Sequence, residues 1–254
     1  MLLVDDRSPD QTGFYVKERF PQVEVFIGDG SLYWAGGVRL ILDNLKESIL
    51  TYDGIVLLND DILLLEGGLD SLIDIAFHFD AIAGGMVTTR RGDLESSGSD
   101  LGLICRPKVR VKRANGKVQR CQLLPGHIMV IPMQIYKKLN GFDRDLPYRF
   151  LDLEFTLRAT RAGVPVLLAP EVVAHTEQVH HYYAETSSMR GSLRQLIDAI
   201  LLSPKGPHWR ESVKYLKKVS PLLWWLWLPF FYRAFFVAVF LSYFEKFSKC
   251  TTNK

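Results

Sequence analysis

The sequence predicts an α/β fold in which a mostly parallel central sheet is flanked by helices. Through the first half of the chain, short apolar runs alternate with segments whose apolar residues recur at helical spacing. The run Ile55–Leu58, for example, ends abruptly at Asn59-Asp60-Asp61. A short apolar run of this kind is typical of a buried strand, and its alternation with helices favours a parallel sheet with helices on its faces.

Strands and helices alternate through the first half of the chain, and the pattern changes after Thr88. Each predicted strand is an apolar run bounded by polar or turn residues, and each predicted helix carries an apolar stripe. The predicted strands are 1–4, 23–27, 55–58, 81–87, 123–131, 164–168 and 172–175, and the predicted helices are 9–20, 35–50, 69–79, 134–139 and 150–162. Asn115-Gly116, flanked by Val109, Val111 and Val118, predicts a β-hairpin.

Composition sets the class of protein. The 254 residues are enough for one large α/β domain with an extension, and 48% hydrophobic with 23% charged residues is ordinary for a globular chain. A net charge of +3 is too mild to indicate a nucleic-acid partner. The three cysteines form no CxxC pair and no Cys/His cluster, which excludes a zinc site or disulfide framework and favours a reducing, cytoplasmic setting.

The carboxylates that follow 55–58 are the first candidate site. Ligands of open α/β sheets bind at the carboxyl ends of the strands. Adjacent carboxylates such as Asp60 and Asp61 raise each other's pKa unless a cation lies between them. Hard oxygen ligands suit Mg²⁺ or Mn²⁺ shared with substrate phosphates, so the pattern predicts a metal–diphosphate site at Asp61. The alternative is a polar strand end that starts a turn.

Two further strand ends carry polar side chains. Asp5, Asp6 and Ser8 follow the first strand, where short acceptors can hold a nucleobase edge or ribose hydroxyls. Equally, Ser8 and Asp10 could serve only to cap the next helix. His175 ends the last strand and is a candidate metal or phosphate ligand, with a purely structural histidine as the alternative.

A pair of acids near the start of helix 150–162 is the candidate for proton transfer. Asp152 and Glu154 alternate with apolar residues there. A carboxylate near a helix N-terminus is kept ionised by the helix dipole, which suits a general base that must accept a proton from a hydroxyl. The alternative is a helix-terminal acid that forms a surface salt bridge with Arg158.

Segment 106–120 is strongly basic, with seven Lys or Arg residues and no acid. One interpretation is a solvated edge hairpin protected from aggregation by charge. The other is a surface for an anionic acceptor or for anionic lipid headgroups.

The C-terminal part differs in character. A Pro- and Gly-rich linker at 203–207 predicts a domain over 1–203 and a basic, aromatic-rich helical extension over 204–254. Segment 221–244 would reach about 36 Å as a straight helix, at about 1.5 Å per residue, which is enough to span a bilayer. Pro229 and Arg233 interrupt it, however, and its tryptophans favour the interface. We therefore expect a peripheral or monotopic element at the inner face of the cell membrane, with a spanning helix or a buried oligomer-forming helix as alternatives.

Taken in order, these motifs resemble the family 2 glycosyltransferases of GT-A fold. Segment 4–12 is similar to that family's VDDGSTDGT stretch, and Leu58–Asp61 is similar to the LNDD form of its DXD motif. Gly28–Trp34 with Gly36-Gly37 resembles a GDGxLYWxGG stretch of a bacterial, rhamnosyltransferase-like branch, and 126–163 resembles the region that leads to the catalytic carboxylate. The resemblance covers about 2–175, and the family's first strand and helix would precede Met1.

The resemblance implies inverting transfer of a sugar from a UDP- or dTDP-sugar to a hydroxyl of a glycan or lipid-linked acceptor, assisted by Mg²⁺ or Mn²⁺. By it, Asp152 would be the base, with Glu154 as the fallback, and Asp61 and His175 would lie at the metal. The residues that would contact the nucleotide sugar are Asp5, Asp6, Ser8, Asp29, Trp34, Asn59 and Asp60. A non-catalytic, membrane-associated degenerate module is the alternative, because no first strand precedes Met1. A nucleotidyltransferase is disfavoured, because no glycine-rich basic loop lies near the first strand.

Overall fold

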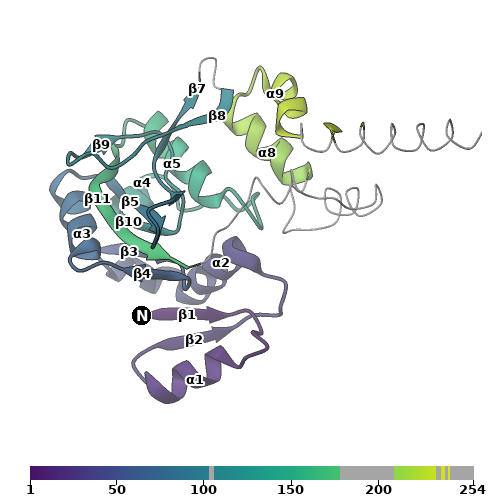
Figure 1. Ribbon diagram of the computed structural model, residues 1–254. Coiled ribbons are helices and arrows are strands. Elements are labelled where there is room, and N and C mark those ends of the chain that lie inside the picture. Colours follow the sequence, from purple (N-terminus) through teal and green to yellow (C-terminus); the bar gives the residue numbers. More distant parts are fainter. Residues whose placement is uncertain (103–105, 178–208, 233–235, 238–239, 241–254) are drawn as a thin grey trace, which may run out of the picture. The chain divides into compact units, whose positions relative to one another are not determined.

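The structure, a computed structural model, describes residues 1–102, 106–177, 209–232, 236–237 and 240 (Figure 1). The chain divides into two compact units. The first comprises Met1–Leu103 and Lys108–Gln178, and the second comprises Ile104–Pro107 and Val179–Lys254. The domain boundary predicted at 203/204 lies outside the described residues.

A small two-stranded sheet opens the first unit. Its strands β1 (Leu2–Asp5) and β2 (Glu24–Ile27) run parallel, and α1 (Thr12–Arg19) connects them. The next helix, α2 (Tyr33–Leu45), ends at Lys46, whose φ is +47°. A 3₁₀ helix follows, so the helix predicted over 35–50 is divided at this left-handed residue.

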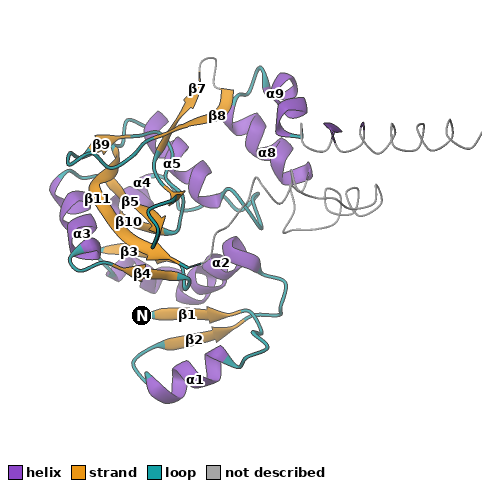
Figure 2. Cartoon of the chain, viewed as in Figure 1, coloured by secondary structure: helices purple, strands orange, loops and turns teal. Residues whose placement is uncertain are grey.

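The larger sheet of the first unit has seven strands, and Figure 2 shows helices around it. Its main order is β3-β10-β5-β11-β4, with β6 paired to β5 and β9 paired to β11. The strands are β3 (Gly54–Leu58), β4 (Ile62–Leu64), β5 (Ile82–Thr89), β6 (Leu94–Ser96), β9 (Gln119–Arg120), β10 (Ile128–Pro132) and β11 (Val166–Thr176).

This sheet is mixed, which corrects the prediction of a mostly parallel one. Strand β10 is antiparallel to both β3 and β5, and β4 is antiparallel to β11. Within this sheet, β5 and β11 form the parallel pair. Strands β5 and β10 are buried along their whole length. A strand that is covered on both faces gives a continuous apolar run whichever way it runs, so the pattern could not reveal its direction.

The predicted hairpin at Asn115-Gly116 is also corrected. The turn itself forms, because Gly116 has a φ of +75° and the Lys117 N–H donates to Asn115 Oδ1. The strands on either side do not pair with each other, since β8 (Arg106–Val111) pairs with β7 (Ser99–Gly102) and β9 pairs with β11. The Asn115-Gly116 pair therefore predicted the turn correctly, but it did not reveal which strands pair with β8 and β9.

Helices cover both faces of the seven-stranded sheet. Along β10, Met129 and Ile131 belong to one buried cluster and Ile128 and Val130 belong to another, as expected for side chains that alternate across a strand. The first cluster includes residues of α4 (Met133–Lys138) and α5 (Leu151–Arg161), and the second includes residues of α3 (Gly68–His78). The architecture is thus a three-layer arrangement of helix, sheet and helix.

The second unit contains two described helices, α8 (Trp209–Val219) and α9 (Trp224–Phe231). They pack against each other, and Pro229 lies inside α9. Among the residues that the structure describes, no helix combines the length and the hydropathy needed to cross a bilayer.

Candidate active site

Four segments that are far apart in the sequence meet beside the carboxyl end of β3. The Trp34 Nε1–H, in the first turn of α2, donates to Asn59 Oδ1 at 2.9 Å. The Asn59 N–H donates to the His127 carbonyl at 2.9 Å. The neighbouring Gly126 N–H donates to Asp152 Oδ2 at 2.6 Å. Of the residues predicted from the sequence, the structure thus connects Trp34, Asn59 and Asp152 in one continuous network.

Gly126 makes this junction possible because it allows a close approach. A Cβ atom added at Gly126 would lie 2.3 Å from Trp34 Cζ2 and 3.3 Å from Asp152 Cβ. The indole therefore lies directly against the backbone of Gly126, and a larger residue at this position would displace either the ring or α5.

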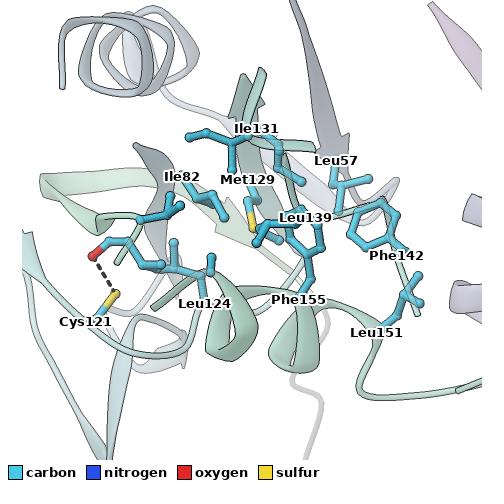
Figure 3. Packing of buried hydrophobic residues seen from close by; sticks show 14 of the residues in the cluster. Leu57, Ile82, Cys121, Leu124, Met129, Ile131, Leu139, Phe142, Leu151 and Phe155 are labelled. Carbon is cyan, nitrogen blue, oxygen red and sulfur yellow. Dashed lines mark hydrogen bonds between the residues drawn. The ribbon is translucent and has the colours of Figure 1, made fainter. Parts of the chain in front are cut away.

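Asp152 is held in place by the hydrophobic core. Its neighbour Leu151 and the following Phe155 are fully buried, and Figure 3 shows both side chains among the residues of the core cluster. Burial raises the pKa of the Asp152 carboxyl, although hydrogen bonds from the N–H groups of Gly126 and Leu153 oppose the rise. A carboxylate with a raised pKa accepts a proton more readily, which suits a general base.

Glu154 plays a different part. Its side chain is only 6% exposed and forms a bidentate pair with Arg158, with Nε–Oε1 at 2.9 Å and Nη2–Oε2 at 3.0 Å. Arg158 also donates to the carbonyls of Leu139 and Gly141. The structure contains the Glu154–Arg158 salt bridge that the sequence offered as an alternative, but the Glu154 side chain in it is buried rather than at the surface. The further hydrogen bonds of Arg158 link α5 to the end of α4. This geometry leaves Asp152 as the stronger candidate for proton transfer.

Asp61 lies two residues beyond Asn59 and immediately before β4, and His175 lies in β11, the strand that pairs with β4. The register of this pairing places Leu63 opposite His175. The Thr176 hydroxyl donates to the Asp61 carbonyl at 2.9 Å. His175 Nδ1 lies 3.0 Å from the Thr88 hydroxyl. The pairing of β4 with β11 therefore sets the Asp61 backbone beside Thr176, one residue from His175.

The chemistry of these two residues fits a divalent cation that is shared with a substrate. No group of three or more His, Cys, Asp or Glu side chains suited to a metal is present among the described residues. Mg²⁺ in phosphate-transfer sites commonly takes one or two protein carboxylates and completes its shell with substrate phosphates and water. A histidine whose Nδ1 is held by a hydroxyl can present Nε2 as a ligand. Among the described residues, Asp61 and His175 are therefore candidate metal donors only together with atoms that a substrate would supply.

The acids at the end of β1, Asp5 and Asp6, hold the loops at this end of the small sheet. Asp5 is buried and accepts hydrogen bonds from the N–H groups of Ser8 at 2.7 Å and Gly13 at 2.9 Å. Burial by itself would raise the pKa of Asp5, but these hydrogen bonds outweigh it and lower the pKa below its ordinary value. Both oxygens of Asp5 are therefore engaged with the backbone that leads into α1.

Asp6 organises the start of α2 in the same way. It accepts from the N–H groups of Gly30 at 2.7 Å, Leu32 at 2.9 Å and Tyr33 at 3.2 Å. It thereby satisfies donors at the N-terminus of the helix that carries Trp34. Sequence reasoning considered Ser8 and Asp10 as caps of α1, and Asp10 does accept the Thr12 N–H at the start of that helix. The role of Asp6 at α2, which is distant in the sequence, was not predicted.

The remaining predicted residues are more exposed. Asp29 accepts from the N–H and the hydroxyl of Ser31, in a local turn that lowers the pKa of Asp29. Asp60 is exposed, and Ser8 is partly buried beside Asp5. Sequence analysis missed Thr88, the partner of His175. The available signal was a pair of hydroxyl residues, Thr88-Thr89, at the end of an apolar strand.

Comparison with known proteins supports the fold. No family model matches the sequence, and no curated protein matches it. Among solved structures, 96 chains match. A crystal structure of GalNAc-T7 with UDP, GalNAc and Mn²⁺ matches with a TM-score of 0.59 and 12% sequence identity, over 91% of this chain and 44% of that chain. The chain thus spans less than half of that protein, and its mixed α/β architecture resembles a glycosyltransferase fold.

Proposed function

We propose that this protein is an inverting glycosyltransferase that moves a sugar from a nucleotide diphosphate donor to a hydroxyl acceptor. The observation that carries the proposal is the Asp152 carboxylate, whose pKa is raised and which lies against Gly126 in the network that includes Trp34 and Asn59. The likeness of the fold to a glycosyltransferase supports the same reaction class.

The chemistry needs one proton acceptor and one stabiliser of the leaving group. The acceptor oxygen forms a bond to the anomeric carbon as the bond from that carbon to the diphosphate oxygen breaks. Asp152 takes the proton of the attacking hydroxyl, so no covalent enzyme intermediate is needed. Its hydrogen bonds from Gly126 and Leu153 hold the carboxylate in place, while burial keeps it basic enough to accept that proton.

The donor side would be formed by residues at the ends of the strands. Asp61 and His175 would hold Mg²⁺ or Mn²⁺, which supplies positive charge to offset the charge developing on the leaving diphosphate. Asn59, fixed by the indole of Trp34, and the exposed Asp60 would face the nucleotide sugar. The loops that carry Asp5, Asp6, Ser8 and Asp29 would surround the nucleotide, with the Asp5 and Asp6 carboxylates acting through the backbone that they hold.

The donor class follows from the resemblance of the motifs to the rhamnosyltransferase-like branch of family 2, which favours a UDP- or dTDP-sugar. The GalNAc-T7 structure contains UDP, GalNAc and Mn²⁺, which agrees with a uridine donor and a divalent metal. We further propose that the acceptor is a glycan or a lipid-linked sugar and that the enzyme works at the inner face of the cell membrane.

A non-catalytic, membrane-associated module is the second candidate. Two observations favour it: the β1–β2 pair is not joined by hydrogen bonds to the seven-stranded sheet, and both oxygens of Asp5 accept backbone N–H groups. Such a module would bind to a membrane or to another chain without transferring a sugar.

Calorimetric titration of UDP and dTDP, each with and without Mn²⁺, tests the donor site. We expect metal-dependent binding that Asp61→Ala abolishes. Asp74→Ala is the matched control, because Asp74 is an exposed acid on α3. Loss of binding in Asp61→Ala with full retention in the control would support the site. No nucleotide binding by the folded wild type, or equal binding by both variants, would contradict it.

A further inference from the structure

The second unit exposes a compact group of large apolar side chains. Leu222, Trp225 and Leu226 are 87%, 60% and 41% exposed. Leu222 lies in the turn that leads into α9, and the Leu226 N–H bonds to the Leu223 carbonyl, so the chain already has helical spacing here. Residues three and four positions apart lie on one face of a helix. We call these three residues the apolar face of α9.

One large side chain of α9, that of Trp227, is buried. Trp227 lies one residue beyond the apolar face, and α8 packs against this helix. Helix α8 contributes its own buried side chains, including Tyr215 and Leu216. Both helices thus bury apolar side chains, whereas the apolar face of α9 stays exposed.

A row of cations lies on the exposed side of α8. Arg210, Lys214 and Lys217 are exposed and are spaced by four and three residues, which places them along one stripe of the helix. Lys217 Nζ lies 4.8 Å from the centre of the Trp224 ring, in the first turn of α9. This contact brings the basic stripe of α8 next to the helix that carries the apolar face.

We propose that the apolar face of α9 and the basic stripe of α8 together dock on an anionic lipid bilayer. Exposed leucine and tryptophan side chains enter the boundary between headgroups and acyl chains, where the indole ring is favoured. Lysine and arginine beside them are attracted to the negative potential of anionic lipids. An anionic bilayer satisfies both sets of side chains over such a short segment.

Charge argues against a second copy of this chain as the occupant. A symmetric dimer would place the same patch on both subunits, so each basic stripe would lie near its counterpart. Like charges brought together in this way oppose association. The one acid of α8, Glu211, is buried, so the described residues of α8 offer no exposed acid to a basic stripe on a second subunit.

This inference goes beyond sugar transfer, and it can fail independently of it. Binding to vesicles requires no donor, metal or acceptor, and it involves none of the residues placed in the candidate active site. If the membrane contact also serves a lipid-linked acceptor, its loss should lower turnover on that acceptor while leaving nucleotide binding unchanged.

Sedimentation of the full chain with vesicles tests the proposal. We expect binding to vesicles that contain phosphatidylglycerol, weaker binding to pure phosphatidylcholine, and loss of the difference at high salt. Leu222→Ser/Trp225→Ser/Leu226→Ser should weaken binding at least about tenfold. Lys214→Glu/Lys217→Glu should weaken it by a similar factor, because each basic residue near the surface contributes about a fivefold gain.

Matched controls come from the first unit. Phe14→Ser/Tyr15→Ser/Phe20→Ser removes three exposed aromatic rings, and Lys17→Glu/Lys138→Glu reverses two exposed lysines. Both control variants should bind vesicles like the wild type, which would assign the effect to α8–α9 rather than to total hydrophobicity or charge.

A milder variant keeps the test valid if the triple substitution impairs folding. Trp225→Phe retains an apolar ring, yet it should reduce the blue shift of tryptophan emission when anionic vesicles are added. Equal vesicle binding by wild type and both α8–α9 variants would overturn the proposal. So would an absence of wild-type binding, or a wild-type dimer that the triple Ser variant dissociates, since the apolar face would then belong to an interface between copies.

Discussion

The Gly126 N–H donates a 2.6 Å hydrogen bond to the Asp152 carboxylate, and the same glycine lies against the Trp34 indole. One residue without a side chain therefore joins the proposed base to the helix that follows the small sheet. Through Trp34 and Asn59 the contact continues to the end of β3. Changes at any of these positions should affect the reaction through the position of Asp152.

Replacing Asp152 with Asn should lower kcat by about 10²–10⁴-fold, the usual contribution of a general base. Nucleotide binding measured by calorimetry should stay near that of the wild type, because Asp152 belongs to the acceptor side of the proposed site. Near-normal turnover of a folded Asp152→Asn variant would exclude this residue as the base.

The raised pKa of Asp152 also determines how turnover and the free energy of unfolding change with pH. Turnover should fall as the pH decreases through this raised pKa, because protonation removes the base. The folded state binds the Asp152 proton more tightly than the unfolded state does. The free energy of unfolding should therefore decrease as the pH rises from the ordinary aspartate pKa through the raised pKa of Asp152. Asp152→Asn should remove that component, which urea denaturation at several pH values would reveal.

Replacing Glu154 with Gln should chiefly affect stability. It removes the charge opposite Arg158 while leaving that guanidinium partly buried, and breaking a buried pair in this way costs about 3 kcal/mol. The measurement is the free energy of unfolding, with Glu171→Gln, an exposed acid on β11, as the control. A Glu154→Gln variant that keeps its stability but loses turnover would transfer the role of base to Glu154.

Much of the fold could be predicted because the spacing of apolar residues indicates the order of helices and strands. The strand 55–58 and the helices 69–79 and 150–162 each appear within one or two residues of the predicted bounds. Strand direction could not be predicted, because β10 is buried on both faces and inserts between β3 and β5. Pairing between distant strands depends on tertiary packing, which a local pattern does not contain.

The candidate site was predicted unevenly for a similar reason. Asp152 could be singled out as a candidate because its place in the first turn of a helix is a local property. The contacts of Asp6 with the start of α2 and of His175 with Thr88 join residues that are distant in the sequence. Chemical type and spacing indicated which side chains were candidates, whereas the fold determined which of their oxygens and nitrogens were already engaged.

Gly126→Ala should destabilise the protein by about 1–3 kcal/mol, as expected for a group inserted into a packed site. The added Cβ would lie 2.3 Å from Trp34 Cζ2, so a smaller residue at position 34 should relieve the clash. In a double-mutant cycle with Trp34→Leu, we expect the two costs to be less than additive. Additive effects would mean that the indole and the glycine do not restrain each other.

Asp5 should stabilise the fold most at neutral pH. Because the pKa of Asp5 is lowered, the folded state binds the proton of this carboxyl less tightly than the unfolded state does. The resulting stabilisation is fully present above the ordinary aspartate pKa of about 3.9. It is lost as the pH falls through the lowered pKa. Asp5→Asn should therefore lower the free energy of unfolding at neutral pH by about 1.5–3 kcal/mol, the range for hydrogen bonds to a charged group. The difference from the wild type should shrink in acid.

Urea denaturation at neutral and acidic pH measures this difference, with Asp74→Asn on α3 as the control for removal of an exposed acid. If nucleotide affinity also falls in Asp5→Asn at neutral pH, the loop from Ser8 to Gly13 contributes to the donor site through its backbone, because the carboxylate itself is buried beneath it. Unchanged stability with lost affinity would instead indicate direct contact between Asp5 and the nucleotide.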